Sequence, residues 1–82
     1  MLARIKLFGP MSRAAGQAEL NVTLQGDAPT CAALRAYLVA YQPGLAGLLD
    51  GCRFAVNGRF AAEGQLLAEG DEIALIGFVS GG

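Results

Sequence analysis

Apolar and polar residues alternate along two stretches near the start of the chain. In residues 2–8 the alternation places one set of side chains on one face, Ala3, Ile5 and Leu7, and another set on the opposite face, Leu2, Arg4, Lys6 and Phe8. Residues 18–24 alternate again, with Leu20, Val22 and Leu24 facing inward. Such alternation is typical of half-buried strands. The turn residues of segment 9–17 surround about one helical turn, so the pattern predicts a hairpin with a long connection.

A helical repeat follows in residues 31–42. Apolar side chains recur there at three- and four-residue spacing and are predicted to form the buried face of a helix: Cys31, Leu34, Leu38 and Tyr41. Thr30 is suited to cap the start of this helix. Pro43 and Gly44 end it, because proline disfavours the helical conformation of the preceding residue. The stretch "GLAGLL" is predicted to form a loose helical turn.

The second half of the chain predicts three more strands. Residues 52–60 contain a strand, an Asn57-Gly58 pair that favours a tight hairpin turn, and the start of a return strand. A turn at residues 69–71 precedes a last strand with Ile73 and Leu75 on one face and Ala74 and Ile76 on the other. The element order predicts an α+β fold, with a mixed sheet of four to five strands and one main helix on one face. We assign residues 1–76 to this domain and residues 77–82 to an extended C-terminal tail.

One helix leaves the other face of the sheet uncovered. By strand parity Phe8 and Ile76 point away from the helix, and Phe60 follows the hairpin turn. Clusters of bulky apolar side chains on an open face often mark a partner surface. A shift of one residue in register would instead bury all three side chains. The parity favours an interaction face.

Composition and charge exclude several classes of function. The chain has 82 residues, of which 54% are hydrophobic, and its net charge is −1. This size and composition predict one compact domain. The six basic residues are dispersed, so we expect no nucleic-acid binding. No apolar run reaches the roughly 18 residues that span a bilayer, and the start of the chain lacks a signal-peptide pattern, so we expect no membrane association and a cytoplasmic location.

Residues for conventional catalysis are scarce. The chain has no histidine, which removes the commonest general base. Cys31 and Cys52 lack metal-ligand spacing, so we expect no bound metal and two buried, reduced thiols, with a disulfide as the alternative. The carboxylates of residues 69–72 are expected to be solvated at a turn. Ser12 and Ser80 have no base near them in sequence, and no phosphate-binding loop occurs. The chain is not expected to act as an enzyme alone.

The tail "GFVSGG" remains as the candidate functional group. Its six residues can extend roughly 20 Å. Gly81 and Gly82 have no side chains, so their backbone can pass through a narrow channel. A free C-terminal carboxylate is ionised at neutral pH and can attack an activated phosphate as a weak nucleophile. We expect other proteins to act on this terminus; a glycine-rich end that arose by chance is the alternative.

Several stretches together resemble one family. These are "IKLFGPMSRAAG", "PTCAALRAYL", "FAVNGR", "LLAEGDEIALI" and the terminal "VSGG". Over essentially its whole length the chain resembles the ubiquitin-like sulfur carriers, and most closely the MoaD-type small subunit of molybdopterin synthase. The resemblance implies a β-grasp fold in which the first and last strands are central and parallel.

The resemblance also implies roles for single residues. Gly82 would be adenylated and would then hold a thiocarboxylate, and Gly81 would thread the channel of a partner. A hydrophobic docking surface and the tail would bind partner proteins through six residues, Phe8, Phe60, Ile76, Phe78, Val79 and Ser80.

Three kinds of partner follow from the resemblance. An E1-like adenylating enzyme of the MoeB type would use ATP to join Gly82 to AMP, and a sulfurtransferase or cysteine desulfurase would supply sulfur. A MoaE-type large subunit of molybdopterin synthase would then direct this sulfur at a pterin precursor, to form the dithiolene of the molybdenum cofactor. The chain itself would bind no cofactor and would be the non-catalytic sulfur donor.

The tail departs from the family pattern at one point. A proline pair often precedes the Val-x-Gly-Gly ending, whereas this chain has Gly77 and Phe78. Glycine frees the backbone that proline restricts, so a less stiff tail is expected. A carrier for thiamine or another sulfur-requiring pathway therefore stays open. A protein modifier joined to lysines of its targets, and an interaction domain with an inert tail, stay open as well.

Overall fold

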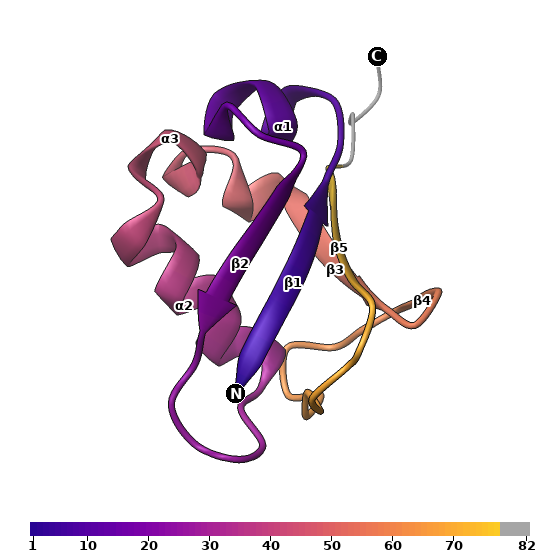
Figure 1. Cartoon of the computed structure of the whole chain (residues 1–82). Helices are drawn as coiled ribbons and strands as arrows, with labels where there is room; N and C mark the ends of the chain where they lie inside the picture. Colours follow the sequence, from indigo (N-terminus) through magenta and orange to yellow (C-terminus); the bar gives the residue numbers. More distant parts are fainter. Residues whose placement is uncertain (78–82) are drawn as a thin grey trace.

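The structure is a computed structural model that describes residues 1–77 (Figure 1). In chain order its elements are β1 (Leu2–Leu7), α1 (Pro10–Ala15), β2 (Glu19–Thr23), α2 (Cys31–Tyr41), α3 (Pro43–Ala46), the 3-10 helix η1 (Leu49–Gly51), β3 (Cys52–Val56), β4 (Arg59–Phe60) and β5 (Ile73–Gly77). The strands form one sheet in the order β2-β1-β5-β3-β4. The α+β fold with a five-stranded sheet is confirmed.

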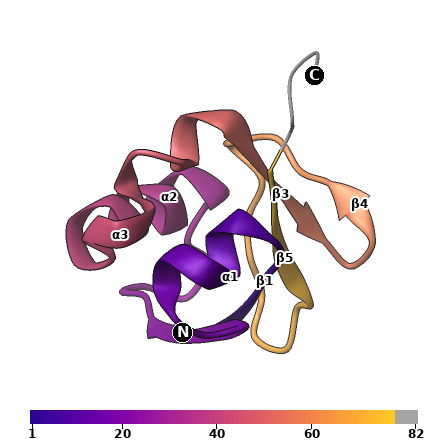
Figure 2. The same ribbon diagram turned by 90° about the horizontal axis from the view of Figure 1, so that it is seen from above.

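The two central strands, β1 and β5, are parallel, as the resemblance implies, while the other neighbouring pairs are antiparallel. A parallel pair needs a long crossover, and the chain between β1 and β5 supplies α2. This helix lies across one face of the sheet (Figure 1). Viewed from above, the helices gather on one side and β4 lies at the far edge (Figure 2).

The alternation predicted for the strands is confirmed. The inward side chains of β1 are buried, whereas Leu2, Arg4 and Lys6 are exposed. In β5 the inward residues Ile73 and Leu75 are buried. Residue 77 still pairs with Cys52, so the last strand runs one residue beyond the boundary that we assigned at residue 76.

The tight turn between β3 and β4 is also confirmed. Asn57 has φ 53° and Gly58 has φ 83°, and a two-residue hairpin turn of this type requires positive φ at both positions. The Asn57 side chain accepts a hydrogen bond from the backbone N–H of Glu72 at 3.0 Å. The turn is thereby fastened to the segment that leads into β5.

The helix α2 begins where the sequence predicts. The Thr30 side chain accepts a hydrogen bond from the backbone N–H of Ala33 at 3.1 Å, which caps the first turn. Cys31, Leu34 and Leu38 are fully buried. Tyr41 is 67% exposed, so the prediction that it completes the buried face was wrong.

The exposure of Tyr41 has a physical reason in the bend after α2. Tyr41 is the last residue of the helix, and the chain turns at Gln42, with φ −128° and ψ 73°, into α3. Leu45 of α3 is fully buried and joins the core at this end of the domain. The Tyr41 ring instead packs on Tyr37, with 4.6 Å between ring centroids.

Arg35 connects α2 to three other parts of the fold. Its Nε and Nη2 atoms donate to both carboxylate oxygens of Glu63, at 2.8 and 3.0 Å. Nη1 donates to the Leu49 carbonyl, and Nη2 donates to the Cys52 carbonyl at 3.0 Å. The guanidinium also lies 5.2 Å from the centre of the Phe54 ring. One side chain thus holds the helix, η1, the start of β3 and the Glu63 loop together.

The Arg35–Glu63 pair predicts a small dependence of stability on pH. The hydrogen bond from Arg35 lowers the pKa of Glu63 below its ordinary value of 4.5. Because the pKa of the folded state is the lower one, the pair stabilises the fold above pH 4.5, and this contribution is lost as pH falls through the folded pKa. We expect Glu63→Gln to cost at most about 1 kcal/mol at neutral pH, since the Glu63 side chain is 52% exposed. Urea midpoints of both chains should converge in acid, and a gap independent of pH would contradict this.

Gly44 is a position where α3 approaches α1 closely. A Cβ atom there would lie 2.8 Å from the backbone oxygen of Ala14, whereas one at Gly47 would meet nothing within 4 Å. We expect Gly44→Ala to destabilise the fold by about 1–3 kcal/mol, because backbone must move to accept the methyl group. Gly47→Ala is the matched control and should be neutral or stabilise by about 0.4–1 kcal/mol. Equal unfolding midpoints for the two variants would contradict this packing.

Candidate docking site

The apolar side chains predicted for the open face lie on the side of the sheet opposite to the helices. Phe8 and Phe60 are each 52% exposed, and Ile76 is half-buried. Leu7 pairs with Leu75, so Phe8 and Ile76 follow at the next position on neighbouring strands. Phe60 lies on the edge strand β4 and pairs with Ala55 of β3. We call these three residues together with Arg53, which pairs with Ile76, the outer patch.

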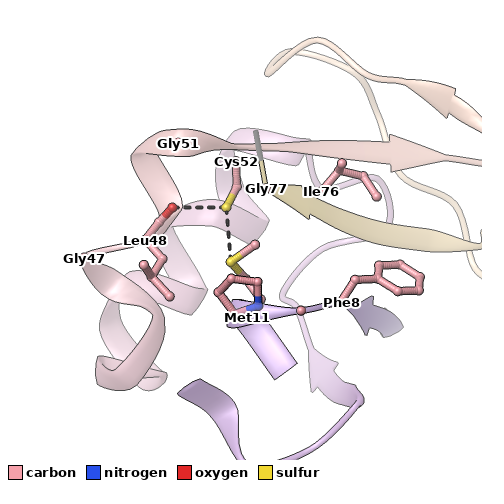
Figure 3. Close-up of a pocket in the computed structure, with 10 residues that line it drawn as sticks. Phe8, Met11, Gly47, Leu48, Gly51, Cys52, Ile76 and Gly77 are labelled. Atoms are coloured by element: carbon pink, nitrogen blue, oxygen red, sulfur yellow. Dashed lines mark hydrogen bonds between the residues drawn. The ribbon is translucent and has the colours of Figure 1, made fainter. Parts of the chain in front are cut away.

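A groove begins beside the outer patch, at the end of β5 (Figure 3). It has a volume of ≈ 500 Å³, a size that suits a side chain or small ligand. Its lining comes from α1, η1 and its flanks, and the ends of β3 and β5: Phe8, Gly9, Pro10, Met11, Gly47, Leu48, Gly51, Cys52, Ile76 and Gly77. Phe8 and Ile76 thus belong to both the patch and the groove, whereas Phe60 lies apart from the groove.

Two sulfur atoms face each other inside the groove (Figure 3). The Cys52 thiol donates to the Leu48 carbonyl at 3.0 Å, and its Sγ lies 3.5 Å from Met11 Sδ. Burial raises the pKa of the Cys52 thiol, with a smaller opposing effect from Arg35. A protonated thiol is a poor nucleophile and metal ligand, so Cys52 serves here as an apolar lining residue.

The predicted state of the cysteines agrees with the structure. Both Cys31 and Cys52 are free and buried. Burial is also the main reason why the pKa of the Cys31 thiol is raised, and the Glu63 carboxylate raises it further. Residues 1–77 contain no cluster of three or more metal-ligating side chains.

Gly77 lies at the rim of the groove, where the chain leaves the sheet. A Cβ atom at this position would overlap with Met11 Cε and would lie 3.9 Å from Cys52 Sγ. The sequence indicated only that glycine frees the backbone here. The structure adds that Met11 occupies the space of a side chain at residue 77. Five predicted site residues lie outside the described residues: Phe78, Val79, Ser80, Gly81 and Gly82.

The acidic residues at the turn before β5 have a structural role. Asp71 accepts hydrogen bonds from the Asn57 side chain at 3.0 Å and from the Ala68 backbone N–H at 2.8 Å. These bonds fix the turn and the approach to β5, beyond the solvated role that we expected.

No helix within residues 1–77 has the length and hydropathy needed to cross a bilayer.

Comparison with known proteins gives one family match. The ThiS family model matches residues 5–82. A search of curated proteins found no match.

Solved structures similar to this chain include modifier proteins and subunits of molybdopterin-converting factor. Small archaeal modifier protein 1 from Haloferax volcanii is 32% identical, with a TM-score of 0.85 and 100% of both chains covered. Subunit 1 of molybdopterin-converting factor from Helicobacter pylori, solved in complex with subunit 2, is 28% identical, with a TM-score of 0.70 and full coverage of both chains. A putative subunit 1 from Pyrococcus furiosus is 20% identical, with a TM-score of 0.84 over 96% of this chain and 99% of that one, which supports the fold. The arrangement is the ubiquitin-like β-grasp that the resemblance implied.

Proposed function

This chain belongs to the ThiS family, and on that premise we propose that it is a sulfur carrier whose last residue, Gly82, holds the sulfur as a thiocarboxylate. The observation that carries the proposal is the family match, which extends through Gly81 and Gly82. The Gly82 carboxylate attacks the α-phosphate of ATP and releases pyrophosphate. The outer sulfur of a donor persulfide then attacks the acyl carbon and displaces AMP, and a thiol reductant cleaves the S–S bond of the resulting acyl disulfide, which leaves the thiocarboxylate on Gly82.

The described residues support a carrier that depends on partners. The two thiols within residues 1–77 are buried, which raises their pKa, and these residues contain no group of three or more metal-ligating side chains. What they offer instead is the outer patch and the groove, which lie at the end of β5. A partner that binds there lies next to the point where the tail begins. The same partner can therefore bind the domain and also reach the C-terminus.

We assign the carrier to molybdopterin synthesis. The support is the Helicobacter pylori subunit 1, 28% identical over both full chains, which is solved with subunit 2. In this assignment a MoaE-type large subunit takes the tail, and the sulfur on Gly82 enters the dithiolene of molybdopterin. A MoeB-type adenylating enzyme uses ATP, and a sulfurtransferase or cysteine desulfurase supplies the sulfur. The carrier itself binds no cofactor and acts in the cytoplasm. A thiamine-pathway carrier is the alternative within the same family.

A protein modifier is the second candidate function. It is favoured by the 32% identity to the Haloferax volcanii modifier protein over the full length of both chains. Both functions begin with adenylation of Gly82 and differ in the nucleophile that follows. A sulfur nucleophile yields the thiocarboxylate, whereas a lysine amine of a target yields an isopeptide bond.

Mass spectrometry of the intact chain tests the proposal. Protein isolated from its own cells should include a fraction with one oxygen replaced by sulfur at Gly82. That fraction should vanish in cells that lack the adenylating enzyme, which is the matched control. Repeated absence of the sulfur-containing species, with lysine adducts that end in Gly82 present instead, would overturn the carrier and support the modifier.

A further inference from the structure

Arg53 lies in the middle of the outer patch. It is an exposed residue of β3 and pairs directly with Ile76 of β5. Its guanidinium carbon lies 4.9 Å from the centre of the Phe60 ring. Stacking on an aromatic face holds a guanidinium in place and leaves the N–H groups along its edge able to donate. Arg53 is therefore a positioned cation between two apolar side chains.

Arg53 forms no ion pair within residues 1–77. The one salt bridge formed there joins Arg35 to Glu63. Two acidic residues, Asp50 and Glu63, line a pocket together with Arg53, and neither forms an ion pair with it. The residues beside Arg53 on this face are Ala55, Ile76 and Phe60, and none of them can accept a hydrogen bond through its side chain.

A protein that covers the outer patch would therefore remove from water a cation that has no ion-pair partner within residues 1–77. Removing a cation from water without an ionic partner costs free energy. A carboxylate beside the cation offsets this desolvation cost, and the attraction between the two charges strengthens as water is excluded. Arginine is also suited to hold a carboxylate with two parallel hydrogen bonds. Arg53 thus selects for partners with a carboxylate at this point and against those without one.

We propose, building on the carrier function above, that Arg53 is a recognition residue: it binds an aspartate or glutamate of the partner protein, next to an apolar side chain that packs on Phe8 and Ile76. A polyanion is a poorer occupant of this face. Glu19 and Glu72 share a pocket with Arg4 and Lys6 on the same side of the sheet, so no continuous cationic surface forms there.

Arg59 offers a matched control. It is also an exposed arginine, next to Phe60 on β4, but it pairs with the inward-facing Val56 and so has the opposite parity. We would measure dissociation constants of the full chain for the large-subunit protein and for the adenylating enzyme of the same organism. Arg53→Glu should weaken binding to at least one of them by about tenfold or more, and more at low salt. Arg59→Glu should change it by less than about threefold.

A cross-linking experiment identifies the contact directly. In the Arg53→Lys variant a primary amine replaces the guanidinium, and a zero-length carbodiimide joins an amine to a carboxylate that touches it. Mass spectrometry of the complex should find an amide between position 53 and an aspartate or glutamate of the partner. Unchanged thermal midpoints of the Arg53 variants would confirm that they are folded.

The outcomes separate this inference from the carrier function. If the chain acquires sulfur while Arg53→Glu binds as well as Arg59→Glu and no amide forms at position 53, the role of Arg53 is wrong and the carrier function stands. If Arg53→Glu loses binding in a chain that never acquires sulfur, the carrier function is wrong and the recognition role stands. If the wild-type chain binds neither protein, both are wrong.

Discussion

Adding one alanine after Gly82 is expected to reduce sulfur transfer to background while the domain stays folded. The extension moves the carboxylate away from Gly82 and puts a methyl group where the two glycines have none. An active-site channel that fits bare backbone excludes that methyl group. The described core ends with Leu75 in β5, so thermal unfolding should be unchanged. The measurements are the mass of the chain after incubation with the adenylating enzyme, ATP and a sulfur donor, and product formation with the large subunit.

A matched variant separates two effects of the extension, the shifted position of the terminal carboxylate and the added methyl group. Gly82→Ala keeps the length of the chain and its free terminus but adds the same methyl group. If only the position matters, Gly82→Ala should still acquire sulfur while the extended chain does not. If the channel is narrow, both should fail. Full activity of the extended chain would contradict the carrier function.

The extended variant also distinguishes a protein that is processed at its terminus from a plain interaction domain. A carrier would lose its thiocarboxylate, and a protein modifier, which needs the same terminus, would lose its lysine adducts. An interaction domain with an inert tail would lose nothing. The outer patch is present in all three cases, so partner binding by the extended chain reports on the domain alone.

Local sequence signals predicted most of the fold, because they act over a few residues. Asn57-Gly58 specifies a tight turn through backbone conformations that few other residue pairs adopt. Thr30 specifies a helix start through one side-chain hydrogen bond. Period-two alternation placed Phe8 on the outer face of the sheet. That prediction required only knowing which of the two alternating sets of side chains faces the core.

The features that the sequence did not predict depend on contacts between distant residues. Arg35 and Glu63 are 28 residues apart, and nothing local to either residue indicates that they meet. The groove needs Met11, Cys52 and Gly77 to converge from three elements. Tyr41 has the correct helical spacing but occupies the last turn, where the path of the chain after Gln42 decides what is buried. Spacing identifies a face; tertiary packing decides how far along the helix that face is covered.

Phe8→Asp is expected to weaken partner binding strongly without unfolding the chain. Phe8 is 52% exposed and lines the groove beside Ile76, so its removal costs the folded core little. In a complex the new carboxylate would be desolvated in apolar surroundings, close to the acidic group that Arg53 is proposed to bind. Central apolar contacts typically account for about 2 kcal/mol or more, so we expect binding to weaken by about thirtyfold or more. Calorimetric titration with the large-subunit protein measures this.

Leu2→Asp is the matched control for that variant. Leu2 is 50% exposed and is the first residue of β1, on the same face of the sheet as Phe8, which directly follows the strand's other end. Leu2 does not line the groove. Both substitutions replace an exposed apolar side chain with one carboxylate, so they change the net charge and the solubility of the chain equally. If the docking surface is the outer patch, only Phe8→Asp should weaken binding, because Leu2 lies outside the covered area. Equal losses in the two variants would mean that partners cover the whole sheet or respond to charge alone, and the assignment of the outer patch would be wrong.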